Sequence, residues 1–302
     1  MSSSMRVLIG GGSGFIGRHL RTALQGRGHD VTVISRTTGP GRITWSELES
    51  NARLPACDAV VNVSGENILQ PGRRWTKKFQ ADVRSSRIDT SKLLVKLMTE
   101  SEEKPKVWVS GHAVGYYNDE IGNAPQDEDC VIEKSSCWMQ QLCLDWEESA
   151  KLSPEVSIRH VAIRTGVVLG KDGGAIQASW WPFYFGTGGI VGSGKQICPW
   201  IHLYDMVNLL IHSIENENVS GVLNGVAPCQ DTNYQFTKAF GKALYRPTIF
   251  PMPEFVLNTA FGPDRARVML LGPNVVPKRV LESGFEFKFK DIDIAMHDVV
   301  NS

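Results

Sequence analysis

Residues 10–17 read Gly-Gly-Gly-Ser-Gly-Phe-Ile-Gly, and they follow directly on the short apolar stretch Arg6–Ile9. Glycine at position 11 suits a tight turn out of a strand, and glycine at position 14 lets a pyrophosphate approach the backbone. Glycine at position 17 lets the following helix pack close to the sheet. The stretch therefore predicts a turn that binds a dinucleotide at the positive end of a helix. The candidate residues of this turn are Gly11, Ser13, Gly14, Phe15, Ile16 and Gly17.

The segments that follow the turn support this interpretation. Leu20 and Leu24 give helical spacing between Arg18 and Gly28, and Val31–Ile34 is the next apolar stretch. Strand, helix and strand at these distances form a βαβ unit, which implies parallel strands and a right-handed crossover.

Further short apolar strands are predicted along the chain at Ala59–Val63, Val107–Ser110 and Val161–Val168, with a helix over Trp138–Lys151. Alternation of this kind is typical of an α/β protein whose sheet is buried on both faces. We expect a doubly wound Rossmann parallel sheet with a smaller C-terminal substrate or cap region.

The character of the chain changes near residue 170, where glycine-rich loops flank the aromatic segment Trp180–Phe185. We interpret residues 5–170 as the cofactor-binding Rossmann core and residues 171–302 as the substrate or cap region. The last part, from about 250 to 302, is expected to be a subdomain of its own. A later strand or helix is free to return to the Rossmann sheet.

The balance of charge excludes some classes of partner. Lys+Arg and Asp+Glu both number 32, so no basic excess points to nucleic acid or to an anionic membrane. No run of about 18 apolar residues predicts a membrane-spanning helix. We expect a small-molecule substrate of open identity, no nucleic acid or membrane partner, and a monomer or homodimer.

The six cysteines are scattered, with no pair or cluster spaced as metal ligands are, so we expect free thiols and no metal site. This favours a soluble intracellular protein, most simply cytoplasmic, with an organelle left open. Residues Met1–Ser4 precede a second methionine and resemble an expression remnant or a leader without structure, not a signal peptide.

The end of the second predicted strand indicates which dinucleotide is bound. Proteins specific for NAD usually carry Asp or Glu there, whereas this chain carries Ser35 and Arg36. A hydroxyl and a guanidinium suit a 2′-phosphate, which a carboxylate would repel. We therefore expect NADP(H). The alternative is that Arg36 is only a solvated loop residue.

The chain resembles a known family over essentially its whole length. The glycine turn, Asn-Val-Ser-Gly-Glu-Asn-Ile at 62–68 and Arg-Ser-Ser-Arg-Ile-Asp-Thr at 84–90 resemble the atypical, epimerase-like family of short-chain dehydrogenases/reductases. Gly272–Pro277 with Gly284–Phe285 resembles the C-terminal domain of that family. Members of the family are sometimes labelled cell-division-inhibitor-like. Further matches are Ala113–Tyr117, Trp146–Glu147, Arg164–Gly170, Gly192–Gly194 and Pro199–His202.

The resemblance implies roles for individual residues. It places Ser35 and Arg36 at the adenosine phosphate, Val63 and Ser64 along the cofactor, Asp82 and Arg87 near the dinucleotide, and Val168 near the nicotinamide. By residue type alone, Arg87 would equally be a charge on a helix surface, and Val168 would be core.

The usual catalytic residues of this superfamily are missing. Most members use a Ser or Thr, a Tyr, and a Lys four residues later that lowers the pKa of the Tyr. Counting back from Glu147, the Lys position is Cys143 and the Tyr position is Met139, and no Tyr-x-x-x-Lys occurs within Ser136–Lys151. The Ser position is His112. Cys143 is expected to be inert core.

Three residues offer substitutes for the missing proton donor. Tyr116 and Tyr117 follow a predicted strand at the edge where open α/β sheets bind ligands, and His112 titrates near neutral pH. The alternative is that Tyr117 packs the wall of the site and His112 makes a structural hydrogen bond. For the pair His202 and Asp205 we favour a structural role.

Two functions remain open from the sequence. The first is an NADP(H)-dependent oxidoreductase or epimerase acting on a small polar substrate. The second is a protein that binds NADP(H) without turnover and signals to a protein partner.

The Arg73-Arg74-Trp75 segment after Gln70-Pro71 either closes over an anionic substrate or is a solvated loop with one anchoring Trp.

Overall fold

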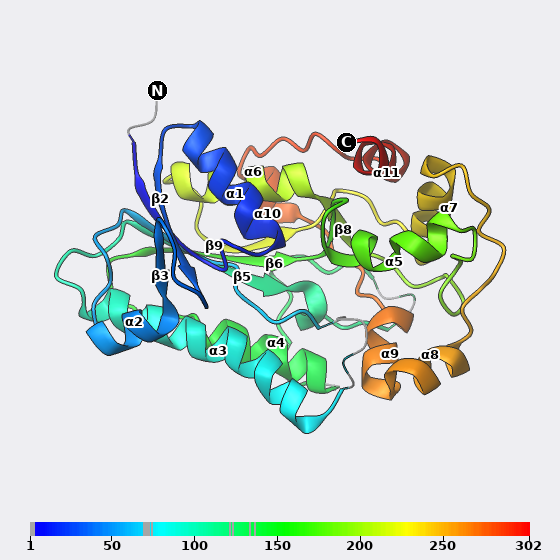
Figure 1. The fold of residues 1–302 in the computed structure, drawn as a ribbon, viewed down its shortest axis with the longest axis horizontal. Coiled ribbons are helices and arrows are strands. Elements are labelled where there is room, and N and C mark those ends of the chain that lie inside the picture. Colours follow the sequence, from blue (N-terminus) through cyan, green and yellow to red (C-terminus); the bar gives the residue numbers. More distant parts are fainter. Residues whose placement is uncertain are drawn as a thin grey trace.

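A computed structural model describes residues 4–68, 73, 75–120, 122, 124–132, 134–135 and 137–302. The first three residues of the expected leader therefore lie outside the described part. Within the described residues, seven strands form one sheet in the order β3-β2-β1-β4-β5-β6-β9, and all neighbours are parallel (Figure 1). The strands are β1 (Arg6–Gly10), β2 (Asp30–Ser35), β3 (Arg42–Thr44), β4 (Ala59–Asn62), β5 (Val107–Ala113), β6 (Arg159–Thr165) and β9 (Gly221–Gly225).

The strand order reverses between β1 and β4. From β1 the chain first builds outward to β2 and β3, and then crosses to β4 and continues through β5, β6 and β9. In open α/β sheets the crevice for ligands lies at the carboxyl ends of the strands where this reversal occurs. Gly10 and Asn62 pair in register at that edge.

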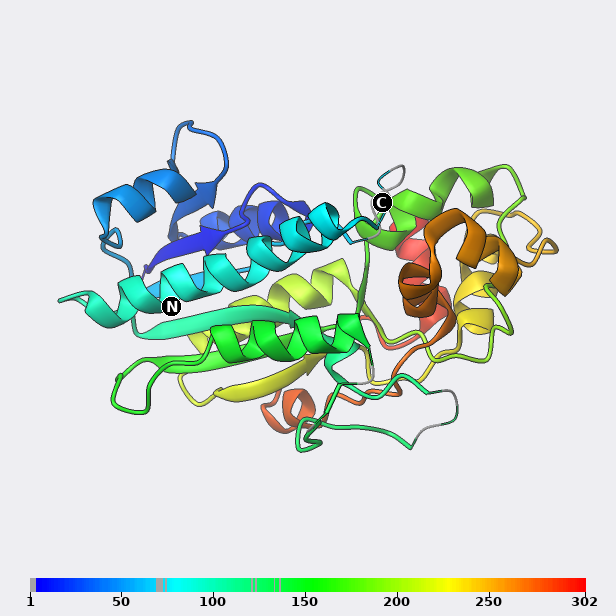
Figure 2. The same ribbon diagram turned by 90° about the horizontal axis from the view of Figure 1, so that it is seen from below.

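Helices cover both faces of the sheet, as Figure 1 shows. One face carries α1 (Phe15–Gly26), α6 (Leu203–Glu215) and α10 (Lys278–Glu282), and the other carries α2 (Trp45–Asn51), α3 (Lys77–Glu100) and α4 (Trp138–Ser149). Figure 2 shows α3 and α4 side by side across their face. Val7 and Ile9 pack toward the α1 layer and Leu8 toward the α3 layer. This alternation explains why the strands are apolar throughout. The predicted doubly wound Rossmann fold is confirmed.

The predicted strand Val161–Val168 is wrong in one respect, because it is two strands in different sheets. After β6 the chain leaves the main sheet, and β7 (Val167–Leu169) pairs with β8 (Trp200–His202) in a separate parallel pair. Gly166 makes this departure possible, since a Cβ there would lie 2.6 Å from the carbonyl oxygen of Pro199.

The remaining helices lie beyond the carboxyl edge of the sheet (Figures 1 and 2). They are α5 (Gly174–Tyr184), α7 (Asn233–Ala243), α8 (Glu254–Phe261), α9 (Pro263–Leu270) and α11 (Ile292–Asn301). Ile176, Phe240 and Met296 give α5, α7 and α11 a shared apolar core. A 3-10 turn, η1 (Val114–Tyr116), follows β5.

Residues after 170 also belong to the main sheet. β9 is its edge strand beside β6, and α6 packs against α1. The Rossmann core therefore draws on both parts of the sequence. Within the described residues no helix has the length and apolar character to cross a bilayer. All six cysteines are free thiols.

Asp205, at the start of α6, ties the C-terminal segment to the sheet. Its carboxylate is 1% exposed and accepts hydrogen bonds from the backbone N–H groups of Lys288 and Phe289, both at 2.9 Å. His202 does not pair with it. The His202 ring accepts from the N–H of Tyr204 and lies 3.4 Å from Asp298. Both residues thus have structural partners, as favoured from the sequence.

We predict that Asp205→Ala lowers the free energy of unfolding by about 2–4 kcal/mol, because it leaves two buried N–H groups without an acceptor. Urea denaturation followed by circular dichroism measures the loss. Asp298→Ala is the control, since the Asp298 side chain is 44% exposed and accepts no backbone N–H group of the described residues, so its loss should cost less, about 0.5 kcal/mol. Equal losses for the two variants would contradict this account of Asp205.

Candidate functional site

The glycine turn after β1 lies against the end of β4. Gly11 has a φ of +78°, and a Cβ there would lie 2.7 Å from the backbone nitrogen of Ser64. Both features require glycine. Gly14 donates its N–H to the carbonyl of Gly11 at 2.9 Å and is the N-cap of α1. No side chain caps this helix, so the first N–H groups of α1 are available to an anion.

Gly17 is constrained more closely than the sequence indicated. A Cβ at Gly17 would lie 2.2 Å from the carbonyl oxygen of Gly11, so the helix packs on the turn itself as well as toward the sheet. By contrast, Gly14 has an ordinary φ of −78°, and the nearest atom to a Cβ there is Gly11 O at 3.2 Å. The space beside Gly14 is therefore the open side of the turn.

Phe15 connects the turn to the loop after β7. A Cβ at Gly173 would lie 2.2 Å from the ring of Phe15, and one at Gly170 would lie 2.8 Å from it. Glycine is needed at both positions because the Phe15 ring fills the space that a side chain would occupy. The sequence marked the loop as glycine-rich but gave no sign of its partner. Val168, from the same connection, is buried in the cluster to which Phe15 and Ile16 contribute.

Val63 and Ser64 lie beside the glycine turn. Val63 donates its N–H to Gly10 at 2.9 Å, and the Ser64 N–H and hydroxyl both bind the side-chain oxygen of Asn62. Asn62 is 2% exposed, and its amide reaches Ser91 on α3. Sequence reasoning gave Asn62 no role, yet it fixes the shape of this edge.

Ser35 and Arg36 differ sharply in their freedom. Ser35 is buried, and its hydroxyl is engaged with the backbone of Thr37 as both donor and acceptor. The Arg36 side chain is 87% exposed, and its one ion pair in the described part of the chain is with Glu66, at 3.6 Å. Arg36 is therefore able to swing toward a ligand at the end of β2, while Ser35 shapes the turn.

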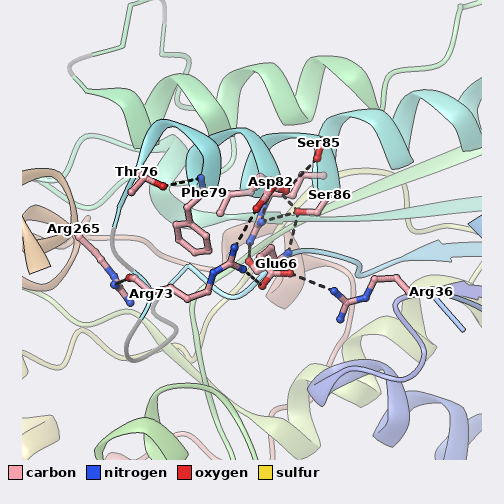
Figure 3. A network of polar contacts seen from close by, with 11 residues as sticks. Arg36, Glu66, Arg73, Thr76, Phe79, Asp82, Ser85, Ser86 and Arg265 are labelled. Atoms are coloured by element: carbon pink, nitrogen blue, oxygen red, sulfur yellow. Dashed lines mark hydrogen bonds and ion pairs between the residues drawn. The ribbon is translucent and has the colours of Figure 1, made fainter.

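Arg36 belongs to a group of four charges, which we call the Glu66 cluster: Arg36, Glu66, Arg73 and Asp82 (Figure 3). Arg73 binds Glu66 and Asp82 through different nitrogens, both at 3.1 Å, and its guanidinium lies 4.5 Å from the ring centre of Phe79. Asp82 is thus connected to Arg36 through Arg73 and Glu66. Gln70, Pro71 and Arg74, named with Arg73 in the sequence analysis, lie outside the described residues.

Arg87 is a buried residue of α3, which excludes the surface-charge alternative. Its guanidinium donates to the carbonyls of Glu66 at 3.0 Å and Val83 at 3.1 Å and lies 5.1 Å from the ring centre of Trp146. Burial lowers the pKa of Arg87 to about 10. A Cβ at Gly65 would lie 3.0 Å from the Arg87 guanidinium carbon. Arg87 therefore holds the backbone at Gly65–Glu66 in place.

The position of the missing Lys is filled by the buried Cys143, and the position of the missing Tyr by the partly buried Met139. A Cβ on Gly115 of η1 would lie 3.2 Å from the sulfur of Cys143 and 3.8 Å from Met139. Cys143 is 3% exposed, and burial raises the pKa of its thiol to about 12. The thiol is therefore neutral at physiological pH, in agreement with its interpretation as inert core.

Tyr117 is fully enclosed by a polar network. Its hydroxyl accepts from Arg164 and donates to Asn224, both at 2.8 Å, and Arg164 binds Glu147 through two hydrogen bonds. Burial raises the pKa of Tyr117 to about 12. The Tyr116 hydroxyl accepts the N–H of Ile132 at 3.3 Å. The two rings connect η1 to β6, β9 and the loop before α4.

His112 faces α4 in a buried polar group. Its Nε2 lies 2.7 Å from the Ser110 hydroxyl, which also lies 2.8 Å from His160. Burial lowers the pKa of His112 to about 3, so the ring is neutral at pH 7. Its Nδ1 has no hydrogen-bond partner among the described residues. The ring packs on Trp146 at 5.1 Å between centres.

A hollow opens next to the Met139 position, between the start of α4 and α9. The residues that line it are Trp75, Cys137, Trp138, Met139, Asp264 and Arg267. Arg267 is bound by Asp119 through two hydrogen bonds, at 2.7 and 3.1 Å. Within the described residues, no three His, Cys, Asp or Glu side chains are grouped so that they could hold a metal ion.

The parallel sheet, the uncapped helix and the glycine turn define an α/β protein of the dinucleotide-binding class. The sequence pattern of the NAD dependent epimerase/dehydratase family matches residues 7–224, and the chain belongs to that family. A domain of unknown function, DUF1731, matches residues 252–299. The resemblance noted in the sequence is confirmed, including its C-terminal domain.

Known relatives match along most or all of their length. Epimerase family protein SDR39U1 of Mus musculus is 46% identical over 297 residues, covering 98% of this chain and 100% of the relative. A chloroplastic homologue from Arabidopsis thaliana is 35% identical, covering 99% of this chain and 87% of the relative. The crystal structure of human SDR39U1 (isoform 2) with NADPH is 45% identical and has a TM-score of 0.95, covering 99% of this chain and 100% of that one.

We predict that Cys143→Lys destabilises the protein by several kcal/mol, because it places an ammonium in a closed space beside the Arg87 guanidinium. Cys143→Ala is the control and should cost about 1–2 kcal/mol, since it only leaves a small cavity. Thermal and urea unfolding of both variants measure the difference. A Lys variant as stable as the Ala variant would mean that the usual Lys position still has access to water.

Proposed function

We propose that this chain binds NADPH across the β1–β4 edge, with the pyrophosphate at the Gly11–Gly17 turn and the 2′-phosphate on Arg36. The observation that carries the proposal is the uncapped start of α1 beside the open space at Gly14. The exposed Arg36 guanidinium supplies the matching cation at the end of β2. The NADPH bound to human SDR39U1, at a TM-score of 0.95, supports the same choice of cofactor.

Roles for the other candidate residues follow from their places. Ser13, Phe15 and Ile16 complete the turn at the start of α1, and Ser35 fixes the turn that carries Arg36. Val63 and Ser64 lie between the turn and Asn62, where a ribose would contact them. Asp82 and Arg87 act on the same edge through Arg73 and the backbone of Glu66. We assign Val168, which shares an apolar cluster with Phe15, to the nicotinamide side.

We further propose that the protein is an oxidoreductase or epimerase acting on a small polar substrate. The bound cofactor would supply a hydride as NADPH or accept one as NADP+. The family to which the chain belongs supports this reaction class. The hollow beside Met139 has a volume of about 10 Å³, which is room for one water molecule, so the proposal does not rest on it. Met139 stands there where the superfamily resemblance expects Tyr.

A second function is favoured by the packing of η1 against α4. Cys143 and Met139 fill the usual catalytic positions, and Tyr117 and His112 are enclosed by structural partners. A protein built in this way would bind NADP(H) without turnover and signal its presence to a protein partner. The free cysteines favour an intracellular setting for either function, and the chloroplastic homologue keeps an organelle open.

The first prediction of this proposal concerns the cofactor. NADPH should bind at least about tenfold more tightly than NADH, and Arg36→Gln should remove most of that preference because it removes a charge-assisted bond to the 2′-phosphate. Isothermal titration or fluorescence titration of both cofactors measures the preference. Equal affinities of the unmodified protein for the two cofactors would contradict the role of Arg36.

Gly14→Val serves as the matched control for the site itself. It should abolish binding of both cofactors, because the new side chain occupies the open side of the turn. The fold should persist, since the φ of Gly14 is one that Val can adopt.

The second prediction separates the two functions. General acid–base help is worth roughly 10²–10⁴-fold in rate, so we expect NADPH to bind but to be oxidised slowly with ordinary carbonyl substrates. Absorbance at the nicotinamide band, with a panel of aldehydes, ketones and sugar nucleotides, measures the rate. Fast turnover that Tyr117→Phe abolishes without loss of fold would make Tyr117 the proton donor. Fast turnover that survives the same change would place the chemistry elsewhere in the chain.

A further inference from the structure

The carboxylate of Glu66 lies between two guanidinium groups that come from different elements (Figure 3). Arg36, after β2, approaches one oxygen at 3.6 Å. Arg73, before α3, binds the other oxygen at 3.1 Å. A phosphate bound by Arg36 would therefore arrive at a cation that already has an anionic partner.

Glu66 is the fixed member of this pair. Its backbone N–H donates to the Ser86 hydroxyl at 3.0 Å, and its carbonyl accepts from the buried Arg87 guanidinium at 3.0 Å. The Glu66 side chain is 21% exposed, compared with 87% for Arg36. Any change of partner must therefore come from movement of Arg36 away from Glu66.

The Glu66 cluster contains two cations and two anions, so it is neutral before any ligand binds. A phosphate monoester brings a charge of about −1.5 to −2 at pH 7. A 2′-phosphate in contact with Arg36 would lie within roughly 7 Å of the Glu66 carboxylate, a distance at which like charges still repel measurably. Binding therefore costs both the ion pair and this repulsion.

We infer that Glu66 is a specificity-determining residue that competes with the 2′-phosphate for Arg36 and so lowers the preference for NADPH over NADH. Arg73 limits the competition, because it holds the second oxygen of Glu66 and neutralises part of its charge. The inference rests on the proposed function, since it takes Arg36 as the ligand of the 2′-phosphate. Glu66 itself is a positioning residue for Arg36 and makes no bond to the cofactor.

The test is titration of the full chain with NADPH and with NADH after Glu66→Gln, which keeps the size and shape of the side chain. We expect NADPH to bind about three- to tenfold more tightly and NADH to change less than about twofold. The gain should shrink as the salt concentration rises, because it is electrostatic. Asp145→Asn is the control, because it removes an equal charge from an exposed pair with Arg84 and should leave both affinities unchanged.

The role of Arg73 is tested by a double-mutant cycle. Arg73→Gln should weaken NADPH binding, because the released Glu66 carboxylate then pairs fully with Arg36. In the Glu66→Gln background the same change should have no effect on NADPH binding. A loss that persists in that background would mean that Arg73 contacts the phosphate directly, which would overturn its proposed action through Glu66.

Arg36→Gln separates failure of this inference from failure of the proposed function. If Arg36→Gln leaves the cofactor preference unchanged, the proposed 2′-phosphate site is wrong. If Arg36→Gln removes the preference while Glu66→Gln leaves it unchanged, only the role of Glu66 is wrong. In the Arg36→Gln background, Glu66→Gln should no longer alter the preference, and urea unfolding of each variant shows that the fold is retained.

Discussion

The close approach of the β1–α1 turn to the end of β4 is the constraint on which the rest of this structure depends. Side chains at Gly11 or Gly17 would lie 2.7 and 2.2 Å from backbone atoms of Ser64 and of the turn itself. The contact lies directly after the last paired residues of β1 and β4, Gly10 and Asn62, at the edge where the strand order reverses. Phe15 extends the same constraint to the β7 side, because its ring occupies the space over Gly173.

A second region, from the end of β5 to the C-terminal part of the chain, is held together by polar contacts. Tyr117 links Arg164 of β6 to Asn224 of β9, and Asn224 in turn donates to the carbonyl of Val276 in the C-terminal part of the chain. Since Tyr117 has its partners within the protein, the hydroxyl contributes to stability whether or not it meets a substrate.

Charge plays two distinct roles near the cofactor edge. Arg87 is buried, and its hydrogen bonds to backbone carbonyls fix the chain before α3. Arg36 and Arg73 lie nearer to solvent and share a carboxylate. The buried arginine determines where the Glu66 backbone lies, and the exposed ones determine how strongly the carboxylate opposes an arriving anion.

The sequence by itself determined the parallel sheet, the glycine turn and the place of Ser35-Arg36, since each depends on residues close together in the chain. It gave a family resemblance that covers the whole length. It did not give the break at Gly166, the contact of Phe15 with Gly173, or the pairing of Glu66 with Arg36 and Arg73. It also left open whether Arg87, Tyr117 and His112 face solvent. Only tertiary structure decided these points. Burial and charge pairing depend on which segments the fold brings together, and the type of a side chain does not show what surrounds it.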